Sequence, residues 1–209
     1  MQLRQRFLPD LKDHLLERLL SRHGQLDDDT PDFTDRDRFA VFIVNDQLYE
    51  HQTLQVNYTT YDARRDQDTI NPRTHADVMF LSRDNPSAVN AHPYLYAQVL
   101  KIFHLRILHT GPSSRDTGVQ EFDVLWVRWF QRDVSYGAGW DCKRLHRLSF
   151  FPGRHPDAFG FVDPNDVIRS SHLIPAFAHG KTAAFLPLPS VCRLGEDKDN
   201  DWKHFYINM

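Results

Sequence analysis

The most chemically suggestive part of the sequence runs from Tyr58 to Asp77 and is unusually polar for a segment between apolar ones. Its carboxylates are Asp62, Asp66, Asp68 and Asp77. Carboxylate oxygens suit hard divalent cations, so this set could hold a cation for phosphoryl transfer, as in a metal-dependent nuclease. The spacing matches no calcium loop, and neighbouring arginines can pair with the carboxylates. We therefore predict a salt-bridged structural loop held by Asn71-Pro72, with the nuclease as an alternative.

Three arginines of the same segment could instead contact phosphate groups, namely Arg64, Arg65 and Arg73. Alternation of arginine with aromatic residues suits nucleic acids, because guanidinium groups bind phosphate and rings stack on bases. Residues 38–192, however, hold nearly equal numbers of basic and acidic side chains. A near-neutral body disfavours tight, sequence-independent binding to DNA or RNA. A nucleic-acid-contacting accessory domain is therefore the second hypothesis.

The other ligand and nucleophile types show no catalytic spacing. The twelve histidines are scattered, among them His51, His75, His92, His104, His109, His146, His155, His172 and His179, and none forms an HxxxH or HExxH pattern. Ser149, Ser170 and Ser171 lack the glycine pattern of a nucleophile elbow, and Cys142 beside Lys143 has no identifiable partner. We therefore predict no metal site, no cofactor and no enzymatic activity.

Size and composition favour one soluble domain with appendages. The chain has 209 residues, of which 41% are hydrophobic, and a formal net charge of −3. Its two cysteines are isolated, which favours a reducing compartment. No apolar run is long enough for a membrane span, and the first residues lack the features of a secretion signal. We expect a nuclear or cytoplasmic location.

The N-terminal residues 1–24 are predicted to form an amphipathic helix. Leucines recur at three- and four-residue steps from Leu8 to Leu20, with charged residues between them. Pro9 is expected near the first turn, and Gly24 is expected to end the helix. The acidic segment 25–38 offers little apolar surface and is predicted to be a linker.

From residue 39 to residue 209 the sequence favours strands. Asn45-Asp46 is predicted to be the tight turn of a hairpin between 39–44 and 47–51. The further strand candidates are 53–60, 76–81, 94–108, 122–130, 167–175 and 202–207, all rich in β-branched or aromatic residues. The absence of strand-helix alternation predicts a mostly antiparallel barrel or sandwich.

Two of these stretches resemble the bromo-adjacent homology (BAH) domain. They are PYLYAQVLKIF at 93–103 and VLWVRWFQRD at 124–133, where Trp129, Phe130 and Arg132 match the Trp-Phe-x-Arg signature of that family. DVIRSSHLIPAF at 166–177 resembles its closing strand, with the apolar-Pro step Ile174-Pro175. The resemblance covers roughly residues 50–178. Residues 56–81, with HLIPAF, also resemble uncharacterised fungal proteins linked to transposable elements.

The BAH resemblance implies an SH3-like β-barrel core in a chromatin-associated protein that binds a histone tail, a nucleosome or another nuclear partner. Some members hold a methylated lysine in an aromatic cage, where ring faces attract the cation by about 0.5–2 kcal/mol per favourable contact. The aromatic contact candidates implied here are Tyr94, Tyr96, Trp126, Trp129 and Trp140. The alternative is that Trp126 and Trp129 face opposite sides of one strand and at least one fills the core.

The sequence thus predicts a mostly β protein with an SH3-like, BAH-like barrel behind an N-terminal amphipathic helix. Its leading function is a non-catalytic chromatin- or transposon-associated binding module. The alternatives are the DNA- or RNA-contacting domain and the divalent-metal nuclease.

Overall fold

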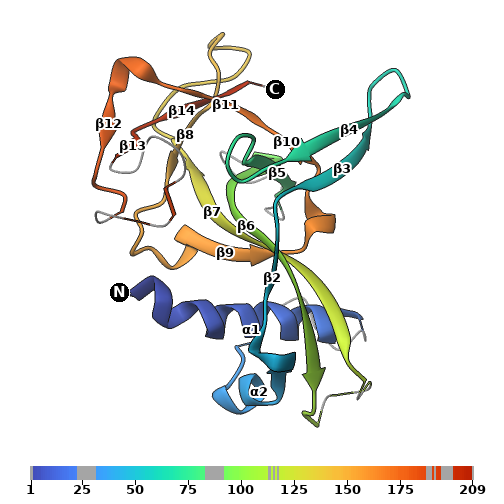
Figure 1. Cartoon of the computed structure of the whole chain (residues 1–209). Coiled ribbons are helices and arrows are strands. Elements are labelled where there is room, and N and C mark those ends of the chain that lie inside the picture. Colours follow the sequence, from blue (N-terminus) through green and yellow to red (C-terminus); the bar gives the residue numbers. More distant parts are fainter. Residues whose placement is uncertain are drawn as a thin grey trace. The chain divides into compact units, whose positions relative to one another are not determined.

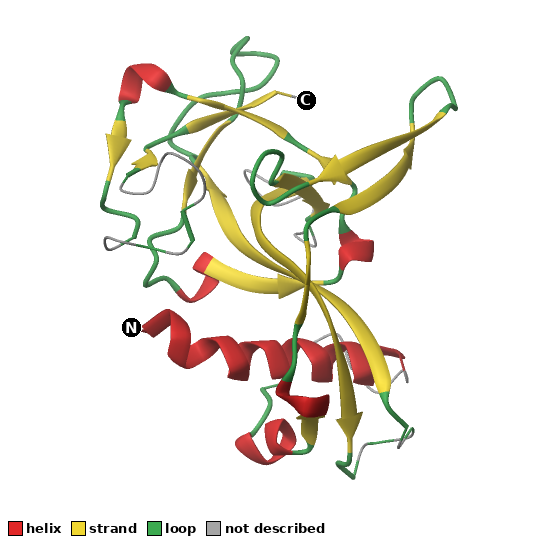
Figure 2. Ribbon diagram, in the orientation of Figure 1, coloured by secondary structure: helices red, strands yellow, loops and turns green. Residues whose placement is uncertain are grey.

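The computed structural model describes residues 2–22, 32–82, 92–112, 114, 116, 118–186, 190, 192, 193 and 200–208. Strands predominate, as predicted, and most of them join one large antiparallel sheet (Figure 1, Figure 2). Within these residues, no helix has both the length and the apolar character that a membrane crossing requires. Cys142 and Cys192 are both free thiols.

The chain divides into two compact units. The helical unit comprises Met1–His51 and Phe103–Val124, and the sheet unit comprises Gln52–Ile102 and Leu125–Met209. The long strands β6 (Tyr94–His109) and β7 (Gln120–Arg132) contribute residues to both units. The strands β1 (Val41–Ile43) and β2 (Tyr49–His51), which follow the predicted linker, therefore belong to the helical unit, and the predicted domain boundary at residue 38 stays a prediction.

Helix α1 (Gln2–Arg22) confirms the predicted N-terminal helix. Its fully or nearly buried side chains are Leu11, Leu15, Leu16 and Leu19, which follow the predicted leucine spacing, whereas Leu8 at the start of that pattern is exposed. Phe7 contacts Phe103 of β6 with 6.4 Å between ring centroids. Pro9 lies inside the helix and not in its first turn, because the helix begins at Gln2. The expected helix end at Gly24 lies outside the described residues.

Part of the predicted acidic linker is helical. Residues 23–31 lie outside the described part, and α2 (Asp35–Phe39) follows them. Thr34 and Asp37 form a capping box, in which each side chain accepts a hydrogen bond from the other residue's backbone N–H. The prediction of a continuous linker was therefore wrong over residues 35–38, where acidic residues cap a helix.

The predicted hairpin at Asn45-Asp46 was also wrong. Both residues adopt positive φ, which suits a tight turn, and they lie in the short 3₁₀ helix η1 (Val44–Asp46). The flanking strands β1 (Val41–Ile43) and β2 (Tyr49–His51), however, do not pair with each other. Each pairs with β6. The long β6 offers a more extensive hydrogen-bonding edge than two three-residue strands offer each other.

The sheet unit contributes further strands to the large sheet: β5 (Asp77–Leu81), β8 (Arg147–Phe150), β9 (Phe159–Val162), β10 (Arg169–Ser170), β11 (His172–Pro175) and β14 (Phe205–Asn208). With β6 and β7, the strand order is β10-β5-β6-β7-β8-β14-β11, and β9 also pairs with β7. Only Ser171 separates β10 from β11, so one short segment holds both ends of the path. The described strands do not close into a hydrogen-bonded barrel, and the expected closed barrel is not seen.

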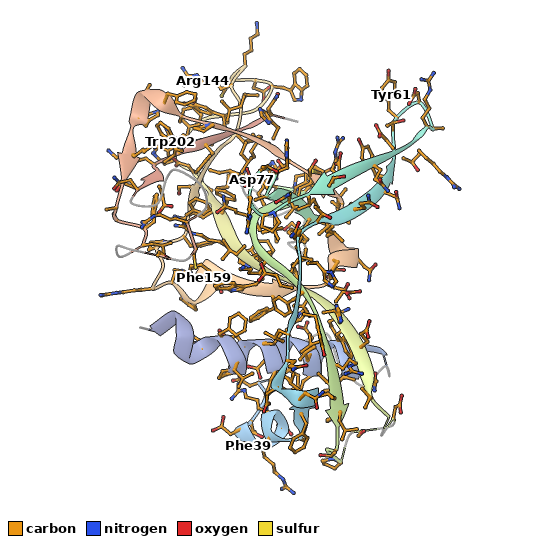
Figure 3. The ribbon with its side chains drawn as sticks, viewed as in Figure 1. Phe39, Tyr61, Asp77, Arg144, Phe159 and Trp202 are labelled. Atoms are coloured by element: carbon orange, nitrogen blue, oxygen red, sulfur yellow. The ribbon has the colours of Figure 1, made fainter. Side chains whose placement is uncertain are left out.

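The polar segment that was predicted to be a loop contains a strand. β3 (Leu54–Thr59) pairs in antiparallel register with β4 (Arg65–Ile70), from Leu54 opposite Ile70 to Thr59 opposite Arg65. Tyr61 is fully exposed at the tip of this hairpin (Figure 3). The sequence of β4 is almost entirely polar, so it carries no apolar alternation by which to recognise it. Its backbone pairing with β3 stabilises it instead.

Two hydrophobic clusters occupy the sheet unit. One includes Val78, Phe80, Ala97, Val99 and Val127, and the other includes Tyr96, Phe130, Leu148, Phe150 and Ile207. Residues adjacent along β5, β6 and β7 alternate between the two clusters, as side chains on a strand must. The sheet is therefore covered on both faces.

The remaining elements are η2 (Pro156–Ala158), η3 (Pro164–Asp166), η4 (Phe177–His179), β12 (Lys181–Thr182) and β13 (Asp201–Trp202).

Candidate ligand-binding pocket

A pocket of about 430 Å³ opens in the sheet unit, where the first residues of β6 lie near the last residues of β7. We call it the β6–β7 pocket. Its lining residues are His92, Tyr94, Leu95, Tyr96, Trp129, Phe130, Gln131, Arg132, Val134, Leu148, Phe151 and Asp157. Rings and aliphatic groups dominate this set, and only Arg132 and Asp157 are charged at neutral pH. Such a lining is typical of sites for small or partly apolar ligand groups.

Strand alternation places Tyr94 and Tyr96 on one face of β6. They lie opposite Leu81 and Met79 of β5, and both pack with the cluster that contains Phe130. Tyr96 is almost completely buried, whereas Tyr94 is only partly buried. Burial raises the pKa of Tyr96 to about 12, so its phenol stays protonated and can donate a hydrogen bond at neutral pH. Tyr96 therefore forms an interior wall, and Tyr94 is the more accessible ring.

Trp129 also lines the pocket, but its indole ring is anchored on the opposite face of β7 from Phe130. Its ring centroid lies 5.2 Å from that of Phe80. Gly160 of β9 lies against the indole so closely that a Cβ atom there would stand 2.8 Å from Nε1. Phe80 belongs to the other hydrophobic cluster. Trp129 therefore serves the core as well as the pocket.

His92 lies beside the two tyrosines at the start of β6. Its ring centroid is 6.1 Å from Tyr94, 5.9 Å from Tyr96 and 4.9 Å from His146. The backbone N–H of Tyr94 donates to His92 Nδ1 at 3.2 Å. Burial, together with the nearby charges of His146 and Arg132, lowers the pKa of His92. The imidazole is therefore neutral at and above neutral pH and adds a further uncharged ring.

Two charged side chains complete the lining. Asp157 is exposed in η2, and its Oδ2 lies 3.6 Å from Nδ1 of His155. Arg132, the last residue of β7, is partly buried and adds a positive charge. The ring of Phe151 stacks on His155 with 4.8 Å between centroids. The pocket thus combines several ring surfaces with one carboxylate and one guanidinium.

The structure brings together three of the five aromatic residues that the sequence pointed to. Tyr94, Tyr96 and Trp129 line the pocket, whereas Trp126 and Trp140 do not. Trp126 lies three residues from Trp129 on β7 and contacts Phe159 of β9 with 6.1 Å between centroids. Trp140 is 96% exposed in the loop before β8. Trp126 and Trp129 thus face opposite sides of one strand, as the alternative interpretation held.

Sequence reasoning missed His92, Phe151 and Asp157 as pocket residues. His92 precedes the PYLY motif by a single residue, so its proximity to the tyrosines was a usable signal. Phe151 and Asp157 come from the chain after β8, a strand that was not predicted. They lie at the pocket because β8 pairs with β7, with Phe150 opposite Phe130.

The polar residues of the β3–β4 hairpin and its surroundings do not gather into one site. Asp62 pairs with Arg64 at 3.0 Å, and Asp68 accepts a hydrogen bond from the backbone N–H of Ser170. Asp77 instead is a partly buried residue of β5 (Figure 3). Among the described residues, the aspartates proposed for a nuclease do not form a group of three converging ligand atoms. Arg64, Arg65 and Arg73 are all exposed.

Comparison of the chain with protein-family models, curated proteins and solved structures finds no significant match. The BAH resemblance therefore rests on the motifs of this sequence.

Proposed function

We propose that this chain is a non-catalytic binding module of a chromatin- or transposon-associated protein in the nucleus. In this proposal the β6–β7 pocket receives a methylated lysine from a protein tail, such as a histone tail presented by a nucleosome. The observation that carries the proposal is that Tyr94, Tyr96, His92 and Phe151 line one cavity, to which Trp129 also contributes although its indole packs on Phe80. Only three of these residues were singled out by sequence, and the additional rings strengthen the case.

The chemistry of the lining favours a methylated ammonium group over an unmodified one. An unmodified lysine in an apolar pocket loses hydrogen bonds to water that the rings do not replace. A di- or trimethylated ammonium has fewer such bonds to lose and gains cation–π contacts of about 0.5–2 kcal/mol each. Asp157 adds attraction for a cation, and the neutral state of His92 avoids repulsion.

Arg132 works against a cation in the same pocket, since like charges repel. The balance of charges among the lining residues is therefore close to even, and we expect ring contacts to supply most of the selectivity. This expectation separates the proposal from simple charge attraction, because binding should depend only modestly on salt.

We further propose that the sheet unit is an SH3-like, BAH-like fold. The support is the segment 169–175, which pairs through β10 with β5 and through β11 with β14. A strand that changes partners in this way joins the two ends of a curved sheet. The same segment includes the HLIP sequence that resembles the closing strand of the BAH family.

The test is binding to a modified histone-peptide array, followed by titration of the best peptide in its unmodified and methylated forms. Tyr94→Ala removes an accessible pocket ring, and the matched control is Tyr61→Ala, which removes a fully exposed ring at the hairpin tip. We expect Tyr94→Ala to weaken binding at least about tenfold, equivalent to about 1.4 kcal/mol, and Tyr61→Ala to leave it unchanged. Equal binding of methylated and unmodified peptides would contradict the proposal.

The second hypothesis, contact with DNA or RNA, is tested by titrating the protein with nucleic acid at several salt concentrations. The exposed hairpin carries Arg64 and Arg65 near Tyr61, but Asp62, Asp66 and Asp68 offset their charge. Binding to duplex or single-stranded DNA that falls steeply with salt, and is lost in Arg64→Ala/Arg65→Ala, would favour this hypothesis over the peptide reader.

A further inference from the structure

Two histidines and an aspartate meet on one face of the helical unit. His51 ends β2, His104 lies on β6, and Asp123 lies on β7. The ligand atoms of the three side chains all lie within 4.8 Å of one another. Nε2 of His51 lies 2.6 Å from Nδ1 of His104. Within the described residues this is the one such group of three or more metal-ligating side chains.

Strand pairing explains why these distant residues converge. β2 and β7 both neighbour β6 in the sheet, so β6 lies between them. Phe103 and Leu105, on either side of His104, are buried, and so are Phe122 and Val124 on either side of Asp123. Because neighbours on a strand face opposite sides, the buried residues cover the core face. His104 and Asp123 consequently share the other, more open face.

Neighbouring groups hold two of the three residues in place. The ring of Tyr49 stacks on that of His104, with centroids 4.8 Å apart and planes 10° apart. Arg18 of α1 donates to the backbone carbonyl of Asp123 at 2.6 Å, and its guanidinium lies 4.9 Å from the centroid of the Phe122 ring. The ring plane of His104 and the backbone of Asp123 are therefore fixed from outside the group.

We propose that His51, His104 and Asp123 bind a divalent transition-metal ion, with Zn²⁺ as the first candidate. Two imidazole nitrogens and a carboxylate oxygen suit Zn²⁺, and three protein ligands leave a fourth position for water or for a group from a partner. The ion would join β2 to β6 and β7 and so stabilise the helical unit. This inference is independent of the β6–β7 pocket.

The present distances require only a small adjustment. Two nitrogens on a tetrahedral zinc ion, each about 2.0–2.1 Å from it, stand roughly 3.3 Å apart. The two imidazoles, now close enough to share a hydrogen bond, must therefore separate slightly to admit the ion. His51 and Asp123 are exposed and His104 is partly buried, so side-chain rotation can supply this movement.

The test uses the full chain freed of metal by a chelator and titrated with Zn²⁺ by calorimetry, with Co²⁺ as a spectroscopic probe of ligand geometry. We expect one Zn²⁺ per chain and a higher melting temperature when Zn²⁺ is present. His51→Ala, His104→Ala and Asp123→Asn should each weaken binding at least about tenfold. His75→Ala, at an exposed histidine of the sheet unit, is the matched control and should bind as the wild type does.

Because His104 packs against Tyr49, His51→Gln serves as a second variant at an exposed position that leaves this packing intact. Loss of Zn²⁺ binding in folded His51→Gln supports the site. The proposal is overturned if the wild type takes up no Zn²⁺, or if His51→Gln and Asp123→Asn both bind it as tightly as the wild type.

Discussion

Arg128 of β7 forms a bidentate ion pair with Asp201 of β13 in the interior of the sheet unit. Nη1 lies 2.8 Å from Oδ1 and Nη2 lies 3.1 Å from Oδ2. Both side chains are almost completely buried, and Arg193 also donates to Oδ2 at 3.1 Å. The Arg128 guanidinium lies 3.6 Å from the centroid of the Phe150 ring. A single carboxylate thus compensates two buried cations.

This arrangement predicts a large cost for removing the carboxylate. Burial by itself raises the pKa of Asp201, but the hydrogen bonds and charges of Arg128 and Arg193 outweigh it and hold the pKa below the ordinary value. Asp201→Asn should lower the free energy of unfolding by about 3–5 kcal/mol, because it leaves two buried guanidinium groups uncompensated. Urea denaturation measures this change. The exposed pair partner Asp62 provides the control, since Asp62→Asn should cost less than about 1 kcal/mol. Similar costs for the two variants would contradict the prediction.

Asp77 predicts that the stability of the folded state depends on pH. Its Oδ1 is enclosed without a hydrogen-bond partner, and burial raises its pKa from 3.8 to about 7. The folded state therefore holds this proton more tightly than the unfolded state between these two values. The contribution of Asp77 to stability is fully present below pH 3.8 and is lost as the pH rises through about 7.

Asp77→Asn should remove this loss, because the amide is neutral at every pH. Relative to the wild type, the variant should gain stability as the pH rises from 5 to 8, by about 2 kcal/mol in total. Urea denaturation of both proteins at several pH values gives the difference directly. A difference that stays constant with pH would show that Asp77 does not titrate in this range.

The contact between Gly160 and Trp129 predicts a coupling between two positions. Gly160→Ala places a methyl group against the indole edge and should cost about 1–3 kcal/mol of stability. Trp129→Phe removes the Nε1 edge that the new methyl group would meet. In the Trp129→Phe background, Gly160→Ala should therefore cost markedly less, which a double-mutant cycle measures.

Gly137→Ala is the matched control for this cycle, since a Cβ at Gly137 meets its nearest side-chain atom, Sγ of Cys142, at an ordinary 3.6 Å. It should be nearly neutral in both backgrounds. If Gly160→Ala costs the same with and without the indole, the close approach of β9 to Trp129 does not govern the effect.

His92 predicts how pocket binding responds to acid. Its lowered pKa keeps the imidazole neutral at neutral pH, and acidification below that pKa adds a positive charge beside Tyr94 and Tyr96. Affinity for a methylated-lysine peptide should therefore fall as the pH drops from 7.5 to 5. His92→Gln should remove most of this dependence. Titrations at several pH values check both statements, and a dependence that persists in His92→Gln would assign it to His146 or another group.

Several elements could be predicted from local sequence patterns alone. The leucine spacing of α1 and the dense β-branched and aromatic residues of β6 and β7 determine those elements, because each pattern matches the repeat of a single helix or strand. The sequence also pointed to Tyr94 and Tyr96 as aromatic contact candidates, and strand alternation in β6 places them on one face. Pattern reasoning failed for β4, whose polar sequence carries no such repeat and which is held by its pairing with β3.

The tertiary structure decided which distant side chains meet. His51, His104 and Asp123 leave no recognisable spacing in the sequence, and neither do Arg128, Arg193 and Asp201. Phe151 and Asp157 reach the pocket only because β8 pairs with β7. The physical reason is that the side-chain repeat of a strand is local, whereas strand order and register depend on hydrogen bonds and burial across the whole sheet.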